Sequence, residues 1–410
     1  MTNISQSNSV DDLSNLMLQR DTNIFGATHE TNSLALSNPN DTSQSTDILP
    51  ENLTTEIERP SKPHINVNKE QTDTVEAKDI NKIPIKPVVE PFNHDATISI
   101  DTISTDNIDC NDTHYEHSNE VGKDHWWITG ASYIGNMHIE KGIECQDSYQ
   151  FKKLANDMGI AVVCDGAGSK VNSKQGADLV AKRSVEWLAQ IIENAKYIAE
   201  ESLPGIANDL YEYIYSELKK YSEENTLPFE SLGSTLIAVI YSPEWLACFH
   251  IGDGRAAYQK TDDKSWEALL DPWNTEEGYT IFTTTNEIKE APVPRLDYIR
   301  SRFISGSVAS FAIMSDGCEN ASFECQIFDS HTQKYIKPNR PFPGFFNPVK
   351  KQLINIHHHF NSLEYLTDEE KQKSVNEVWQ KFLKQGTTQL TREADDRTMI
   401  FAINSLFNDD

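Results

Sequence analysis

Residues 159–166, GIAVVCDG, place five apolar residues in a row directly before an Asp-Gly pair. A short apolar run that ends in a turn signal is typical of a strand in a protein core. The same arrangement returns in FHIGDG at residues 249–254 and in SFAIMSDG at residues 310–317. These three strands, each ending in Asp-Gly, are the features from which the rest of the fold is predicted.

The remaining sequence alternates between strand-like and helix-like patterns. Further strands are predicted from β-branched and aromatic runs: WWITGASYIG at 126–135 (as strand, turn and strand), STLIAVIY at 234–241, EWLACFHIG at 244–252, RAAYQK at 255–260 and RTMIFAI at 397–403. The runs between 234 and 260, joined by SP and GDG turns, suggest an antiparallel meander. Apolar residues recur at three- and four-residue steps, which predicts helices over 175–196, 204–221, 347–365 and 367–383. Because this order gives no regular βαβ alternation, an α+β sandwich of antiparallel sheets covered by helices is expected.

The first part of the chain differs from the rest in composition. Phe25 and Phe92 are the only aromatic residues before Tyr115, whereas all seven tryptophans lie at or after Trp126. A segment with little apolar surface to bury cannot offset the entropy lost when its backbone becomes ordered. We therefore predict a disordered polar segment over residues 1–124 and one large domain over residues 125–410.

Charge and cysteine usage exclude several classes of protein. The 410-residue chain has a formal charge of −27, whereas nucleic acids and anionic membranes are bound through Lys and Arg, so neither partner is expected. No signal peptide is visible, and no run of about 18 apolar residues predicts a membrane span. The six cysteines show no CxxC spacing, and several lie in apolar runs, which favours a reducing compartment and a cytoplasmic location.

Five aspartates stand beside the predicted strands: Asp147, Asp165, Asp253, Asp316 and Asp395. A carboxylate at a strand end points into the space beyond the sheet edge, and a following glycine leaves its carbonyl accessible. Carboxylates, carbonyls and waters are the ligands of hard cations such as Mg²⁺ and Mn²⁺, and no Cys/His set with zinc spacing occurs. A single Asp-Gly pair is more often only a turn. The recurrence of the pattern predicts a site where cations offset repulsion among converging carboxylates.

Six short motifs occur in a fixed order between residues 126 and 404: ECQD, CDGAGS, LGST, IGDGR, MSDG and DDRT. This series resembles the metal-dependent protein phosphatases of the 2C type, above all bacterial members with an opening like ASYIGNMH followed by CQD. The resemblance implies an αββα sandwich of two antiparallel sheets flanked by helices. It also implies a binuclear Mg²⁺ or Mn²⁺ site at one end of the central sheets, with a third, weakly bound ion in bacterial members.

The resemblance assigns roles to individual positions. Asp165 resembles the carboxylate that bridges both metals, and the carbonyl of Gly166 matches the backbone ligand. Asp316 and Asp395 resemble ligands of the first metal. Asp147 matches the acidic position of the opening motif, which helps to hold the metals or their waters.

The chain also departs from the family pattern. Asp253 resembles a residue that contacts the third metal, but Asn320 replaces a further third-metal carboxylate. The phosphate-binding Arg of many members falls at Gly142, and His138, four residues earlier, is a candidate substitute as phosphate donor and catalytic residue. Ala167 replaces a His that is a proposed general acid.

The function implied is a Ser/Thr phosphoprotein phosphatase that uses a metal-bridged water and forms no covalent intermediate. Its partners would be a phosphoprotein substrate and a cognate Ser/Thr kinase. The departures keep two alternatives open: a non-catalytic phosphoprotein-binding or scaffolding module with the same fold, and an enzyme for small phosphoesters. The insert at residues 260–294 falls where the family places a variable flap near the substrate.

The consecutive residues His357–His359 are not expected to share one zinc ion, because consecutive residues on a helix point in different directions.

Overall fold

The computed structural model describes residues 125–407, apart from residues 196, 274–278, 325–326, 332 and 337. The segment 1–124, for which disorder is predicted, lies outside the described residues. None of the helices in the described part of the chain is long and apolar enough to cross a membrane.

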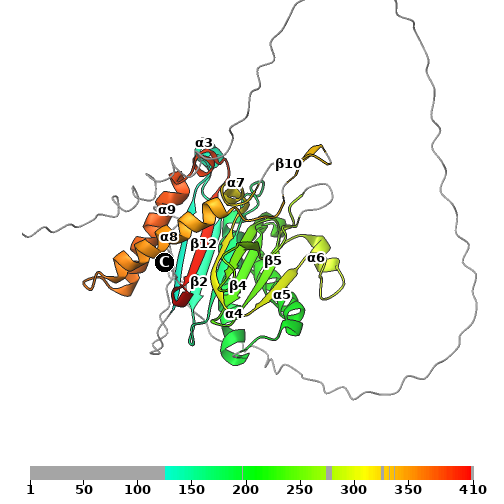
Figure 1. Ribbon diagram of the computed structural model, residues 1–410. Helices are drawn as coiled ribbons and strands as arrows, with labels where there is room; N and C mark the ends of the chain where they lie inside the picture. The colour runs from blue at the N-terminus through cyan, green and yellow to red at the C-terminus, as the bar shows by residue number, and fades with distance from the viewer. Residues whose placement is uncertain are drawn as a thin grey trace, which may run out of the picture. The chain divides into compact units, whose positions relative to one another are not determined.

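Two five-stranded sheets form the centre of the fold (Figure 1). The first sheet has the order β1 (Trp126–Tyr133), β12 (Arg397–Asn404), β9 (Val308–Met314), β6 (Arg255–Lys260), β7 (Glu267–Ala268). The second has the order β2 (Ser148–Lys153), β3 (Gly159–Cys164), β4 (Leu236–Tyr241), β5 (Trp245–Ile251), β8 (Arg300–Ser305). All neighbouring strands run antiparallel, which confirms the predicted class of fold.

The position of strand β3, covered on both faces, explains why its sequence is a continuous apolar run. Ile160 and Val162 point to one face of the sheet and pack under helices, whereas Ala161 and Val163 point to the opposite face and pack between the two sheets. A strand with both faces covered needs no polar alternation. Each aliphatic side chain of valine size or larger that is fully buried in this way stabilises the fold by about 1.5–3 kcal/mol.

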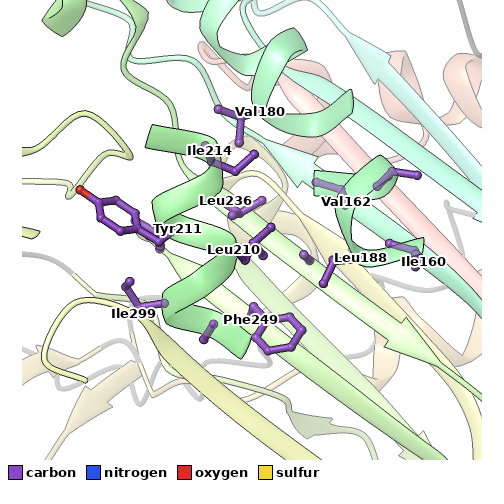
Figure 2. Close-up of a cluster of buried hydrophobic side chains, with 14 of the residues drawn as sticks. Ile160, Val162, Val180, Leu188, Leu210, Tyr211, Ile214, Leu236, Phe249 and Ile299 are labelled. Carbon is purple, nitrogen blue, oxygen red and sulfur yellow. The ribbon is translucent and has the colours of Figure 1, made fainter. Parts of the chain in front are cut away.

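Helices α4 (Ser173–Ala195) and α5 (Leu203–Asn225) cover the outer face of the second sheet. Figure 2 shows Val180 and Leu188 of α4 and Leu210 of α5 in one apolar cluster with side chains of the strands beneath them. The apolar stripe of the predicted helix, from Ala177 to Ile192, is therefore the buried face of α4.

Helices α8 (Pro343–Asn361) and α9 (Asp368–Gln385) cover the first sheet and appear in orange in Figure 1. Trp379 lies fully buried on α9 and donates a hydrogen bond of 3.0 Å from Nε1 to the carbonyl of Met399 on β12. The sandwich thus has helices on both outer faces. The smaller elements are α3 (Asn136–Lys141), η1 (Glu200–Ser202), η2 (Phe229–Leu232), α6 (Asn286–Glu290), η3 (Asp316–Cys318), α7 (Glu319–Ser322), β10 (Ile327–Asp329), β11 (Lys334–Ile336), α10 (Thr388–Arg392) and η4 (Ser405–Phe407).

Two local predictions are wrong. The stretch beginning at Trp126 is one continuous strand, because Gly130 makes no turn but lets the ring of Tyr149 approach; a Cβ at Gly130 would lie 2.6 Å from that ring. The meander is also interrupted after β5. Gly252 adopts a positive φ of 104°, and the turn carries the chain into the other sheet, where β6 pairs with β9 and β7.

Candidate metal centre

The five predicted aspartates occupy the ends of strands that meet at one end of the sandwich. Asp165 follows β3 and Asp253 follows β5, and these strands run in the same direction because each is antiparallel to β4. Asp316 follows β9, whereas Asp395 stands two residues before its antiparallel neighbour β12. Asp147 comes directly before β2, the antiparallel neighbour of β3, and so stands at a strand start.

Three of these carboxylates form a compact group. Asp165, Asp253 and Asp316 each offer a carboxylate oxygen, and the three oxygens lie within 4.8 Å of one another. A second group with the same spacing consists of His138, Asp395 and the neighbouring Asp396. Only the first group contains carboxylates from three separate strand ends.

Burial and mutual repulsion raise the pKa of these carboxyl groups. Burial raises the pKa of Asp165 well above its usual range, and the charges of Asp147 and Asp316 raise it further. Burial also raises the pKa of Asp316 to about 7, with Asp253 and Asp395 adding to the effect. The pKa of Asp147 rises to about 8 for the same two reasons, burial and the charge of Asp396.

The donor set fits a hard divalent cation. Oδ1 of Asp316 is buried and has no hydrogen-bond partner among the described residues, so its lone pairs are available to an ion. Gly166 follows Asp165 directly, and its backbone packs closely on the residue before Asp147, because a Cβ at Gly166 would lie 2.5 Å from the carbonyl oxygen of Gln146. Carboxylates with an adjacent backbone carbonyl match the ligand preference of Mg²⁺ and Mn²⁺.

Hydrogen bonds from neighbouring residues fix the loops that carry the carboxylates. The backbone N–H of Asp165 donates to Thr235 Oγ1 at 2.9 Å, and the N–H of Thr235 donates back to the carbonyl of Asp165 at 2.8 Å. Thr280 Oγ1 donates to Asp253 Oδ2 at 2.5 Å. Thr280 belongs to the insert at residues 260–294, so this part of the insert lies against the carboxylate group.

His138 occupies a different environment from that expected of a phosphate donor. Its side chain is buried on α3, and Nδ1 lies 2.9 Å from Oδ1 of Asp396. Gly142, at the position of the missing Arg, ends α3 with a φ of +65°, a conformation that favours glycine. The glycine at this position is therefore explained by the end of the helix.

Sequence reasoning missed two acidic residues near this end of the sandwich. Asp396 directly follows Asp395 in the sequence DDRT, and Glu319 directly precedes Asn320, so neither residue has a sequence signal of its own. Arg255 donates to Oε2 of Glu319 from Nη2 at 2.8 Å and from Nε at 3.1 Å, and both side chains are almost fully buried.

Comparisons with known proteins find similarity to protein phosphatases. The family described as Protein phosphatase 2C matches residues 134–355, more than half of the chain. Serine/threonine-protein phosphatase 3 of Escherichia coli (strain K12) is 24% identical over 282 residues, which cover 68% of this chain and 98% of the relative.

Two solved structures of other phosphatases are similar to this chain. One is the catalytic domain of the serine threonine protein phosphatase PstP, in complex with 2 manganese ions, which is 14% identical in sequence with a TM-score of 0.39. The match covers 68% of this chain and 97% of the PstP chain. Serine/threonine phosphatase Stp1 from Staphylococcus aureus is 13% identical, with a TM-score of 0.39, 71% of this chain covered and 98% of that one. Because the family match extends over more than half of its residues, the chain belongs to the protein phosphatase 2C family.

Proposed function

We propose that this protein phosphatase removes phosphate from phosphoserine and phosphothreonine in proteins, with divalent metal ions held by the carboxylates at the end of the sandwich. The observation that carries the proposal is the group formed by Asp165, Asp253 and Asp316, whose oxygens lie within 4.8 Å of one another. The pKa of each of the three is raised, so the group is costly as three bare carboxylates and is stabilised by bound cations.

The proposed ligands would serve two main metal positions. Asp165 would bridge two ions, and the carbonyl of Gly166 would complete the second position. Asp316 and Asp395 would hold the first ion, while Asp147 would support the ions or their waters. Asp253, hydrogen bonded to Thr280, would serve a third and weaker position. Mg²⁺ or Mn²⁺ suits this oxygen donor set, and the PstP structure contains two manganese ions.

Hydrolysis by direct attack of water fits the remaining residues of the site. Two divalent ions, when bound, lower the pKa of a coordinated water and offset charge on the phosphoryl oxygens. Cys164 and Cys318 stand next to the site, but burial raises the pKa of both thiols well above its usual range, which opposes formation of a nucleophilic thiolate. Because Ala167 offers no proton, the leaving alkoxide takes its proton from solvent.

The phosphate-donor role of His138 stays a prediction. Its imidazole would have to turn away from Asp396 and out of the protein interior to reach a phosphate. The buried contact with Asp396 favours a structural role for this side chain.

Substrate and location follow from the family and from cysteine chemistry. A phosphoprotein phosphatase acts on the products of a Ser/Thr kinase, and we propose a cognate kinase as its functional counterpart. Cys164, Cys248 and Cys318 are free and buried. Free thiols are typical of a reducing compartment, which supports a cytoplasmic location.

One assay separates the enzyme from a non-catalytic phosphoprotein-binding module, the alternative that Gly142, Ala167 and Asn320 keep open. The full chain is given a phosphothreonine peptide with Mn²⁺, with and without chelator, and compared with Asp165→Ala. Metal-dependent release of phosphate that is lost in the variant supports the enzyme. Glu193→Ala, an exposed position on α4, is the matched control and retains activity. Peptide binding without turnover would support the module instead.

A further inference from the structure

Asp396 is a buried carboxylate that touches three groups on another segment. Its Oδ1 accepts a hydrogen bond from the backbone N–H of Gly135 at 2.6 Å and lies 2.9 Å from Nδ1 of His138. Its Oδ2 accepts a hydrogen bond from the backbone N–H of Gln146 at 2.6 Å. The side chains of His138 and Asp396 are both almost fully buried, so this contact lies inside the protein.

These contacts distinguish Asp396 from the metal ligands around it. His138, Asp395 and Asp396 have the spacing of a metal site. Both oxygens of Asp396, however, already accept hydrogen bonds from N–H groups, whereas Oδ1 of Asp316 has no partner among the described residues. Asp396 is therefore satisfied by the protein itself, and a cation would have to displace these donors.

The contacts join both ends of one segment to the start of β12. Gly135 and Gln146 enclose residues 136–145, including α3, and Asp147 follows immediately. The start of this segment also packs closely against the backbone before β12, since a Cβ at Gly135 would lie 2.4 Å from the carbonyl oxygen of Ala394. The N–H of Met137 donates to the same carbonyl at 3.0 Å. Asp395 stands between Ala394 and Asp396 and is fixed by the same contacts.

We propose that His138 and Asp396 form a positioning pair that fixes Asp147 and Asp395 in the arrangement required to hold metal ions. The pair closes the loop of residues 135–147 onto the strand that carries Asp395, so two carboxylates from distant parts of the chain are set by one buried contact. This inference rests on the proposed function only in taking Asp147 and Asp395 as part of the metal site. Hydrogen-bonded neighbours of metal ligands typically change metal affinity about 10–100-fold when they are replaced.

The test compares three variants of the full chain. In His138→Asn the amide group stands near the place of Nδ1 and keeps a polar side chain next to Asp396, whereas His138→Leu removes it. Asp396→Asn replaces one accepting oxygen by an NH₂ group, which cannot accept a hydrogen bond from the N–H of Gly135 or Gln146. His358→Leu on α8 is the matched control, because this side chain contacts Trp127 near the opposite end of β1 from Tyr133. Thermal melts of each variant establish that it is folded.

Two measurements are made on each protein. Hydrogen exchange of the metal-free protein reports whether residues 135–147 are held, and the electron paramagnetic resonance signal of free Mn²⁺ gives the dissociation constant without any assay of activity. We expect His138→Leu and Asp396→Asn to speed exchange in that segment and to raise the Mn²⁺ dissociation constant by about tenfold or more. His138→Asn and the control stay close to wild type.

The outcomes separate the possible explanations. Weaker Mn²⁺ binding with unchanged exchange would overturn the proposal, because it would make the pair direct metal ligands. Faster exchange with unchanged Mn²⁺ binding would also overturn it, because the loop would then not position the ligands. Hydrolysis by wild type is measured separately, so a protein that binds Mn²⁺ but does not hydrolyse phosphopeptide contradicts the proposed function, while exchange and binding still decide the role of the pair.

Discussion

Ser315 Oγ donates a hydrogen bond of 2.7 Å to Oδ2 of Asp147, which joins the end of β9 in one sheet to the start of β2 in the other. The same hydroxyl accepts a hydrogen bond of 3.0 Å from the N–H of Thr398 on β12. One serine thus connects three strands at the end of the sandwich where the carboxylates gather. The hydrogen bond favours the ionised form of Asp147 and so lowers its pKa, against the larger effect of burial.

Replacing Ser315 by Ala should destabilise the protein and weaken metal binding together. A buried carboxylate that loses its donor costs about 1–3 kcal/mol of unfolding free energy. Urea unfolding with and without Mn²⁺ measures the loss. Ser310→Ala is the matched control, because this hydroxyl lies on the same strand but donates only to the carbonyl of its neighbour Ala309. Equal losses in the two variants would show that the contact with Asp147 has no special role.

The metal-free protein should become less stable as the pH rises. The pKa values of Asp147 and Asp316 in the folded protein are about 8 and about 7, against an ordinary value of 3.8. The folded state therefore holds more protons on these two groups than the unfolded state does between these limits. Their contribution to stability is fully present below about pH 4 and is lost progressively up to about pH 8. Melting temperatures in chelator should fall over this range.

Bound Mn²⁺ should remove most of this dependence, because the cation replaces the protons as the partner of the carboxylates. Melting curves at matched pH, with Mn²⁺ in place of chelator, measure the difference. A metal-free melting temperature that rises toward pH 8 would contradict the burial and crowding of these carboxylates.

Thr280→Val should reduce hydrolysis of phosphopeptides more than hydrolysis of a small synthetic phosphoester. Thr280 is part of the insert at residues 260–294, and its hydroxyl contacts Asp253. Losing that contact loosens the insert around Thr280, although backbone hydrogen bonds of Trp273 and Thr283 still hold its flanks, and a loosened surface affects a large substrate more than a small one. Thr280→Ser keeps the hydroxyl and should retain both activities. The ratio of kcat/KM for the two substrates decides the question, and an unchanged ratio in Thr280→Val is the contradictory result.

Breaking the buried pair of Arg255 and Glu319 should be strongly destabilising. Removing one partner leaves the other charge buried and uncompensated, which typically costs about 3–5 kcal/mol. Glu319→Ala tests this by denaturant unfolding. The partly exposed pair of Arg183 and Glu186 on α4 is the control, since Glu186→Ala should cost about 1 kcal/mol or less. Similar losses in the two variants would show that the Glu319 site is open to solvent.

The strands that carry the site were predictable because burial leaves a local signature. The apolar runs that end at Asp165, Asp253 and Asp316 are buried on both faces, so their sequences carry few polar residues. The turn at Gly252 could not be interpreted in the same way. The residues GDG permit either a return to the same sheet or a crossing to the other, and only packing of β6 against β9 decides between them.

The partners of the carboxylates were beyond the reach of the sequence. Asp396 and His138 are separated by more than 250 residues along the chain, and no periodicity connects them. Glu319 pairs with Arg255 in the same way across two distant segments. A residue that acts through a long-range hydrogen bond shows its role only when the fold has placed its partner.

An anomalous diffraction map of a crystal soaked in Mn²⁺ would show whether the carboxylates hold metal ions. We expect manganese peaks among Asp165, Asp316 and Asp395, with the carbonyl of Gly166 directed at one of them. A map of the soaked crystal in which these side chains stand apart, with no manganese between them, would contradict this expectation.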